Sequence, residues 1–291
     1  MQKLIAISPA QAGTRLDRIL GEFYPALGLR GRRRLIPQIL VNGQKAHPGY
    51  RPVAGDTVLL PELDSSLPPS LEPALLLHAS GDYNFFFKPA GLDTCSLAGK
   101  AGDTLEARIV KFGAPGELLQ RLDRNTCGIV AQAKNEDAAA RFRQMEKTGL
   151  CRKFYLALVD GVLEKPVTAS WMLRVADRKK TGIRKDQASP ERWTWFIPLP
   201  ELESPRPGTS WAACSIKRGS RHQIRAHAAA LGIPLAGDRL YGGGSGEFCL
   251  RHFFLSFPGA ECLDLEERNG AFPLPEGSRE VLAALVNSAL P

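Results

Sequence analysis

A charged turn between two apolar runs, at residues 118–133, limits most strongly how this chain can fold. The apolar residues at both ends of the stretch have the length and composition of short buried strands. The turn between them carries Asp123, with Arg121 and Arg124 on either side. The chain must therefore leave a sheet here and return to one, and a carboxylate marks the point where it emerges.

The acid in this turn can be interpreted in two ways. The flanking cations favour an ionised carboxylate at neutral pH, which suits a nucleophile or a base. A solvated turn with a local salt bridge contains the same residues, and this stretch alone favours that simpler interpretation. Other parts of the chain have to decide between the two.

The composition limits the class of protein and the kind of partner. With 291 residues, of which 44% are hydrophobic and 23% charged, the chain can form one large globular domain or two. No apolar run approaches the length of a membrane span, and residues 1–9 lack the apolar core of a signal peptide. The formal net charge of +8 favours a polyanionic partner.

The cysteines and histidines do not have the spacing of a metal site. His222 and His227 are five residues apart, so they do not form a metalloprotease-type pair on one helical face. We therefore expect no metal and no other cofactor. The cysteines lack a Cys-x-x-Cys pair, which argues against a zinc site or a disulfide framework and fits a reducing, cytoplasmic location. They are Cys95, Cys127, Cys151, Cys214, Cys249 and Cys262.

Residues 1–60 predict a small α+β module. Thr14 and Asp17 fit a capping box at a helix start, and the apolar residues that follow have helical spacing. The pair Asn42 and Gly43 is the strongest short signal for a hairpin, and a further turn precedes a strand at 57–60. Two short helices and a hairpin bury little surface, so we expect an accessory domain.

A run of cations in this module favours a contact with phosphates. We expect the run to begin a second short helix, which Pro37 ends or distorts. Phosphate contacts need Lys or Arg in a row and little else, although a solvated helix face has the same composition. The run consists of Arg30, Arg32, Arg33 and Arg34.

A domain boundary is predicted at residues 61–75, which are rich in proline and serine, have no period and are typical of a linker. The remaining residues, 76–291, should form a second domain in which strands and helices follow one another. We expect strands at 85–87, 154–159 and 212–216, and helices that begin near Asp103, Asn135 and Gln223.

Three further stretches carry charge or glycine. We interpret the basic segment at 178–185 as a mobile loop that reaches an anionic ligand or, with equal weight, as a solvated hairpin tip. The glycines at 242–246 lack the flanking strand and helix of a phosphate-binding loop, so a flexible loop is the better interpretation. Cations crowd a strand-to-helix passage at 217–227, where a helix N-terminus adds backbone donors. This passage is the second candidate for chemistry.

Five motifs, taken in order, resemble those of RluA-type pseudouridine synthases. The module at 1–60 resembles an S4 RNA-binding domain in its order of elements, so the resemblance covers nearly the whole chain. Five motifs in order are much more specific than any one of them. The motifs lie at residues 88–91, 121–128, 153–159, 222–227 and 237–242.

The resemblance implies a role for each residue of the site. Asp123 would be the nucleophilic aspartate, and Arg225 would be the basic residue that pairs with its carboxylate. Tyr155 would pack on the target base and be placed to move the C5 proton. Arg121 would enter the RNA stack where the target base was. Further RNA contacts are expected from Arg124, His222 and Gln223.

This chemistry suits the residue types. Pseudouridine forms when the N1–C1′ bond of uridine breaks and the bond re-forms through C5, so the base must leave the stack. The reaction needs no redox partner and no metal, but it does need an ionised carboxylate near C1′. Asp123 would either add to the sugar or remove a proton from it to give a glycal, and the sequence is compatible with both.

For residues 76–291 the resemblance implies an α+β fold, with a long, bent, mostly antiparallel sheet around a central cleft where Asp123 and Arg225 meet. An S4-like domain at 1–60 would precede it. We expect a monomer that acts on large-subunit ribosomal RNA, with transfer RNA as the alternative. A non-catalytic RNA-binding or ribosome-assembly protein is the alternative of another class, and the presence of Asp123, Tyr155 and Arg225 argues against it.

Overall fold

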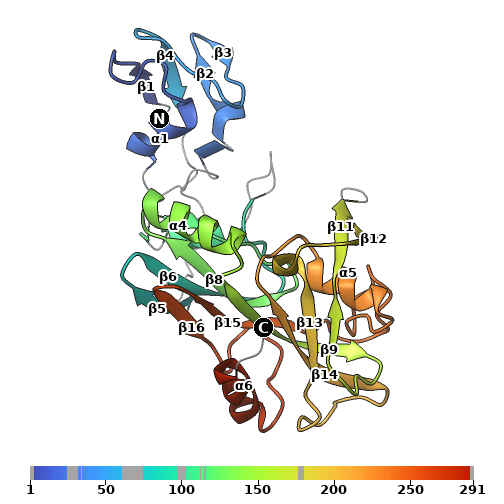
Figure 1. The fold of residues 1–291 in the computed structure, drawn as a ribbon. Coiled ribbons are helices and arrows are strands. Elements are labelled where there is room, and N and C mark those ends of the chain that lie inside the picture. Colours follow the sequence, from blue (N-terminus) through green and yellow to red (C-terminus); the bar gives the residue numbers. More distant parts are fainter. Residues whose placement is uncertain are drawn as a thin grey trace.

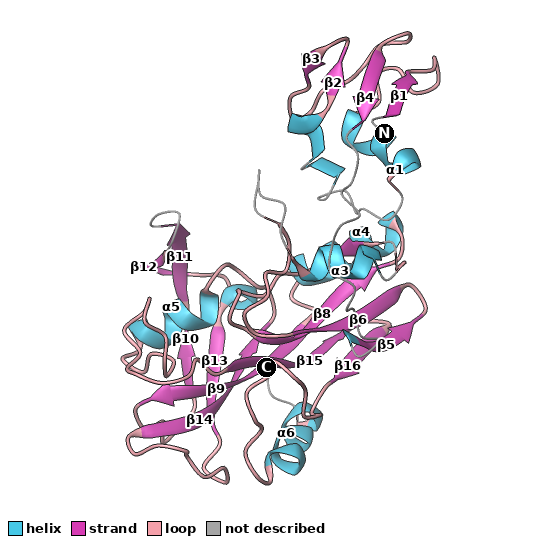
Figure 2. Ribbon diagram, turned by 180° about the vertical axis from the view of Figure 1, so that it is seen from behind, coloured by secondary structure: helices cyan, strands magenta, loops and turns pink. Residues whose placement is uncertain are grey.

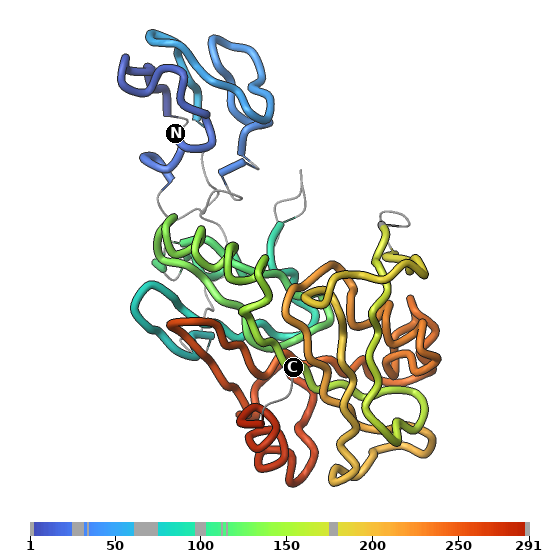
Figure 3. The backbone as a smooth tube through the Cα atoms, in the orientation of Figure 1, coloured from blue at the N-terminus to red at the C-terminus, as the bar shows by residue number. Residues whose placement is uncertain are grey.

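The computed structural model describes residues 3–24, 32–33, 35–60, 75–96, 103–111, 113–114, 116–175 and 180–288. The strands within these residues form three sheets: one of four strands, one of ten strands, and a two-stranded ribbon. Figure 1 shows the four-stranded sheet at the top and the ten-stranded sheet below it. In Figure 3 the backbone of residues 3–24 and 35–60 lies apart from the larger sheet.

The small sheet has the order β1-β4-β2-β3 and is antiparallel throughout. Asn42 and Gly43 both have positive φ, at 51° and 79°, so the predicted hairpin forms with the turn geometry that favours these residue types. Pro37 lies within a short 3₁₀ helix, where the prediction expected the second helix to end. The elements are β1 (Lys3–Ala6), α1 (Leu16–Phe23), η1 (Ile36–Gln38), β2 (Leu40–Val41), β3 (Gln44–Lys45) and β4 (Thr57–Leu60).

The predicted capping box at the start of α1 is wrong. Arg15 is the N-cap residue, and its side chain makes no capping bond. The buried Asp17 carboxylate instead accepts hydrogen bonds from the guanidinium groups of Arg15 and Arg33. The helix is held by burial of its apolar face, with Leu16, Ile19 and Leu20 in the core of this small domain.

The large sheet follows the order β10-β13-β14-β9-β15-β8-β6-β5, with β16 on β15 and β7 on β8. Among the strand pairs that the structure describes in it, only β8–β15 is parallel, so the predicted α+β fold with a mostly antiparallel sheet is confirmed. The strands are β5 (Leu76–Ser80), β6 (Tyr83–Lys88), β7 (Glu117–Leu118), β8 (Cys127–Ala133), β9 (Arg152–Asp160), β10 (Val167–Ala169), β13 (Thr194–Pro198), β14 (Thr209–Ile216), β15 (Leu250–Phe257) and β16 (Ala260–Leu263).

Helices cover both faces of this sheet, which explains why its central strands are apolar without interruption. On β9, alternate residues enter two different cores: Tyr155 and Ala157 face one, and Phe154 and Leu156 the other. The first core includes α3 (Leu105–Lys111) and α5 (Gln223–Ala230), and the second includes α6 (Ser278–Asn287). Figure 2 shows α5 beside β13, and α4 (Glu136–Lys147) beside β8.

Local signals behave as predicted at α4. The Asn135 side chain accepts a hydrogen bond from the Ala138 amide, which satisfies one of the unpaired donors of the first turn. The apolar face of the helix, with Ala138, Ala139 and Phe142, packs on β6 and β8.

The basic segment at 178–185 is only partly a loop. Thr181–Gln187 forms β12, which pairs antiparallel with β11 (Trp171–Val175), so the prediction of a mobile loop is wrong for residues 181–185. Arg178 and Lys179 lie outside the described residues. Among the helices that the structure describes, none combines the length and the hydropathy needed to cross a membrane.

Gly128 is required where β8 and β15 cross beside the site. Its φ is +113°, and a Cβ atom there would lie 2.1 Å from the carbonyl oxygen of His252. A side chain would therefore separate the two strands, which pair through Gly128 and His252.

Candidate active site

Three separate parts of the large domain bring the predicted catalytic residues to one cavity. Asp123 lies on the loop between β7 and β8, Tyr155 on the central strand β9, and Arg225 on α5. All three line a cavity of about 630 Å³. The residues that the sequence placed in two separate motifs, at 118–133 and 217–227, thus meet across the sheet.

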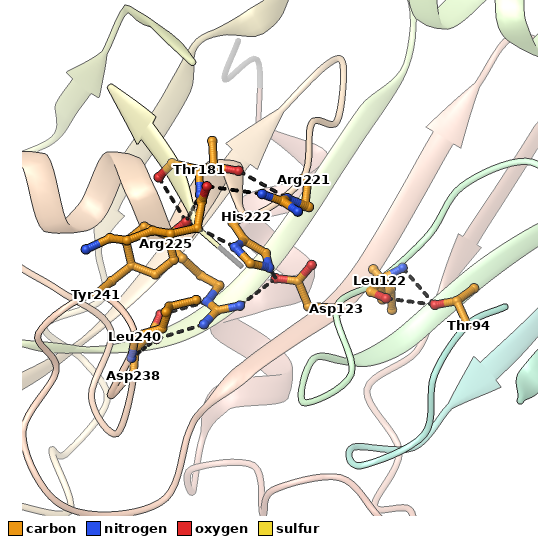
Figure 4. Close-up of polar contacts among 11 residues, drawn as sticks. Thr94, Leu122, Asp123, Thr181, Arg221, His222, Arg225, Asp238, Leu240 and Tyr241 are labelled. Carbon is orange, nitrogen blue, oxygen red and sulfur yellow. Dashed lines mark hydrogen bonds and ion pairs between the residues drawn. The ribbon is translucent and has the colours of Figure 1, made fainter. Parts of the chain in front are cut away.

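Asp123 and Arg225 form an ion pair, as Figure 4 shows. The Nη1 atom of Arg225 donates to Oδ2 of Asp123 at 3.0 Å, and the Asp123 side chain keeps 22% of its surface exposed. Asp123 is therefore held by a cation but still accessible from the cavity. This is the arrangement that a carboxylate needs to remain charged and oriented for reaction.

A second carboxylate anchors the same arginine. Nε and Nη2 of Arg225 donate to the two carboxylate oxygens of Asp238 at 2.7 and 2.8 Å, and the Asp238 side chain is only 1% exposed. This bidentate pair fixes the plane of the guanidinium group, which a lysine could not do. Burial by itself would lower the pKa of Arg225, but the bonds to Asp238 and the nearby Asp123 charge raise it.

His222 forms the third contact near Asp123. It is the N-cap of α5 and has a left-handed backbone with φ of 56°, and its Nε2 atom lies 3.7 Å from Oδ2 of Asp123. Its Nδ1 atom lies 3.0 Å from the Tyr241 hydroxyl, which donates to the Thr181 carbonyl and accepts from the Thr181 amide. The hydroxyl proton is thus committed to Thr181, so Nδ1 carries the imidazole proton.

The charge of His222 depends on two opposed effects. Burial lowers its pKa, while the negative charge of Asp123 acts in the opposite direction. Burial dominates, so the imidazole is neutral at neutral pH. The cationic partner of Asp123 at this pH is therefore Arg225.

Tyr155 is supported from behind by a histidine. The rings of Tyr155 and His252 stack with centroids 4.4 Å apart and planes 17° from parallel. Nδ1 of His252 lies 2.6 Å from the Ile129 carbonyl, and burial lowers the pKa of His252 to about 3, so this ring is neutral. Burial, with the charge of Asp123, raises the pKa of Tyr155, so its hydroxyl keeps its proton. The tyrosine thus has a fixed orientation toward the cavity.

Two side chains hold the loop that carries Asp123. The Thr94 hydroxyl donates to the Leu122 carbonyl at 2.8 Å and accepts from the Leu122 amide at 3.0 Å (Figure 4). Lys88 is fully buried, and its amine donates to the carbonyls of Pro89, Leu92 and Arg124. The motif at 88–91 therefore has a structural task, which is to lock the loop on both sides of Asp123.

Three of the predicted RNA contacts can be compared with their surroundings. Arg121 is exposed at the cavity, and Arg124 is 63% exposed and paired with Asp93 at 2.7 Å. Gln223 is 2% exposed, and its amide nitrogen donates to the carbonyls of Arg192 and Trp193. Because these bonds use its polar atoms, the structure favours a positioning role for Gln223 at the start of α5 over the predicted contact with RNA.

The N-terminal cations are less available than the sequence suggested. Arg33 donates to Asp17 at 2.7 Å but is half exposed. The Arg32 side chain is only 12% exposed and approaches Glu136 of α4 at 3.6 Å, so a direct phosphate contact does not suit it. Arg30 and Arg34 lie outside the described residues.

Sequence reasoning missed the partners of the predicted residues. Asp238 and Tyr241 lie in the motif at 237–242, which was interpreted only as a tight turn under the site. Thr94 and His252 carried no clear signal, because neither belongs to a local pattern. No group of three or more metal-binding side chains occurs among the described residues.

Known proteins resemble this chain over the region that carries the site. A sequence model of the family described as RNA pseudouridylate synthase matches residues 83–230. A protein of Aquifex aeolicus named as an RNA pseudouridine synthase is 28% identical over 247 residues, which cover 78% of this chain and 77% of that protein. Ribosomal large subunit pseudouridine synthase C of Escherichia coli is 26% identical over 258 residues, which cover 82% of this chain and 80% of the relative.

A solved structure has a similar fold. Human RNA pseudouridylate synthase domain containing 1 superposes with a TM-score of 0.58 at 22% sequence identity, and the match covers 77% of this chain and 99% of the human one. This likeness concerns the fold. The region matched by the sequence family includes Asp123, Tyr155 and Arg225, so the residues that meet in the cavity belong to the part shared with known proteins.

Proposed function

We propose that this chain, which belongs to the RNA pseudouridylate synthase family, isomerises specific uridines in large-subunit ribosomal RNA. It is an RNA pseudouridine synthase. The choice of ribosomal RNA rests on the name of the Escherichia coli relative, and transfer RNA is the alternative substrate. The observation that carries the reaction is the Asp123–Arg225 ion pair beside Tyr155 in one cavity.

In this proposal Asp123 acts on the ribose of the target nucleotide. Its carboxylate adds to C1′ or removes a proton from the sugar, and either step releases N1 of the base. Arg225 keeps the carboxylate charged through a bond of 3.0 Å, and Asp238 keeps Arg225 in place. The detached base then turns within the cavity so that C5 faces C1′.

Tyr155 and Arg121 would hold the RNA in its altered shape. Base extrusion costs a few kcal/mol, which an aromatic platform and an intruding cation can offset. Tyr155 offers the ring face opposite the one stacked on His252. Its hydroxyl is the nearest candidate to move the C5 proton, and Arg121 is the exposed cation beside the catalytic acid.

The domain at residues 1–60 would add affinity and no chemistry. We assign it as an S4-like RNA-binding domain, followed by a linker at 61–75 and the catalytic domain at 76–291. Its order of a helix, a cation run and an Asn42-Gly43 hairpin supports this assignment. Arg33, half exposed and paired with Asp17, is its best-placed described cation for a phosphate.

Mapping pseudouridines in cells that lack this protein tests the substrate. Ribosomal and transfer RNA from the deletion strain, the parent, and strains complemented with the wild-type or Asp123→Asn gene would be compared at every uridine. We expect one or a few positions in large-subunit ribosomal RNA to lose the modification, and only the wild-type gene to restore it. Loss confined to transfer RNA would overturn the assignment of substrate, and unchanged maps in both RNAs would refute both.

A further inference from the structure

A second cavity lies beside the catalytic one. It has a volume of about 430 Å³ and lies between the β11–β12 ribbon, the segment before β13 and the residues that lead into α5. Ser220 and Arg221 line both cavities, so the two are neighbours across this segment. A volume of this size is in the range of pockets that bind small molecules or parts of larger ones.

The lining of the second cavity combines apolar surface with positive charge. One wall is formed by Trp171, Met172 and Leu173 of β11, and Met172 is 40% exposed. Among the described residues no Asp or Glu lines this cavity, but three arginines do: Arg174, Arg192 and Arg221. An apolar slot with cations at its rim suits a base together with its phosphate, because bases pack on flat or apolar side chains while arginine binds phosphate.

The walls of the cavity are fixed by bonds to the catalytic helix. Nε2 of His227 on α5 lies 3.0 Å from the Trp171 carbonyl, and the Gln223 amide holds the Arg192 carbonyl at the same distance. Thr181, which also lines the cavity, bonds to the Tyr241 hydroxyl, which contacts His222 beside Asp123 (Figure 4). The cavity is therefore preformed and connected to the site through side chains that the structure already orders.

We propose that this second cavity binds the base of a nucleotide that flanks the target uridine in the substrate RNA, with the arginines at its phosphate. The inference rests on the proposed function, since it assumes that the target uridine occupies the catalytic cavity. Extrusion of that uridine also separates its neighbours from the stack. A neighbouring base that leaves the stack needs a new apolar surface, and the wall of β11 provides one at the edge of the catalytic cavity.

The test compares three variants with the wild-type protein. Met172→Glu places a carboxylate on the apolar wall, Met172→Leu keeps the wall apolar, and Leu263→Glu makes the same change at a site on β16 that is 45% exposed. Dissociation constants would be measured by fluorescence anisotropy for a labelled single-stranded decamer of uridines and for the RNA fragment around the mapped uridine. That fragment would also be made with one base at a time removed near the target.

We expect one flanking base to matter for the wild-type protein, with its removal weakening binding about tenfold. Met172→Glu should weaken the intact fragment and the decamer by a similar factor and lose its response to that base, while Met172→Leu and Leu263→Glu behave as the wild type. If Met172→Glu binds like Leu263→Glu, or still responds to the missing base, the second cavity is not a nucleotide site, whatever the turnover. If the binding pattern appears but no uridine is isomerised, the proposed function fails and the nucleotide site stands.

Discussion

Replacing Asp123 by asparagine should remove catalysis and leave the fold almost unchanged, because the structure gives Arg225 another and stronger partner. Asp123 makes one bond to Arg225 and keeps 22% of its side chain exposed, whereas Asp238 makes two bonds and is 1% exposed. Exposed ion pairs contribute about 1 kcal/mol or less. At about 2–4 °C per kcal/mol for a domain of this size, Asp123→Asn should lower the melting temperature by less than about 4 °C.

Asp238→Asn is the matched control, since it makes the same chemical change on the buried side of Arg225. Breaking a buried ion pair costs about 3–5 kcal/mol. Arg225 retains its bond to Asp123, so we expect about 3 kcal/mol, which corresponds to a fall of about 6–12 °C. The two variants should therefore differ clearly in stability although both remove one negative charge beside the same arginine.

Single-turnover pseudouridine formation at saturating enzyme is the assay, with a melting curve and an RNA binding isotherm on each sample. Asp123→Asn should isomerise uridine at least about 10⁴-fold more slowly, while RNA affinity stays the same or rises because a negative charge leaves a site for a polyanion. A folded, RNA-binding Asp123→Asn protein with a near wild-type rate would refute the role of Asp123. Equal melting losses in the two variants would refute the conclusion that Asp238 is the main anchor of Arg225.

Three further predictions test other parts of the reasoning. Tyr155→Phe should slow tritium release from C5-labelled RNA by about 100-fold or more and change RNA affinity little, because the ring still stacks; equal losses would remove the proton-transfer role. Removal of residues 1–70 should reduce the salt dependence of RNA binding by about 0.7–0.9 logarithmic units for each phosphate that the protein no longer binds, with little change in turnover on saturating RNA, and an unchanged slope would contradict the assignment of that domain. Lys88→Met should lower the free energy of unfolding by about 2–4 kcal/mol at pH 7, because three carbonyls lose their donor. Since burial lowers the pKa of Lys88 from 10.5 to about 8, the folded protein releases this proton before the unfolded chain does. The wild type should therefore gain stability relative to Lys88→Met as the pH rises from 8 to 10.5, and parallel pH profiles would contradict this.

The features that sequence predicted well depend on residues close together in the chain. The Asn42-Gly43 hairpin and the Asn135 cap of α4 each need only a few neighbouring residues, and both formed as expected. Long apolar strands such as β9 were also predicted, because strands buried on both faces have continuous apolar runs.

The features that sequence missed depend on which distant residues meet. His252 and Tyr155 stack because β15 is inserted between β8 and β9, and no local pattern encodes that order of strands. The β11–β12 ribbon was taken for a loop because it belongs to neither large sheet, so β12 exposes charged residues on both faces and shows no alternation. The polarity of Gln223 suggested RNA contact, whereas burial directs its amide to the backbone.

The two carboxylates around Arg225 divide the tasks of folding and reaction between them. Asp238 satisfies the guanidinium group where it is buried, with both oxygens engaged. Among the residues that the structure describes, Asp123 is bonded to the arginine only through Oδ2, so Oδ1 still faces the cavity. A bidentate pair with Asp123 would have occupied both oxygens and opposed attack on the ribose. Because Asp238 provides the bidentate contact, Arg225 can orient the catalytic acid without neutralising its reactivity.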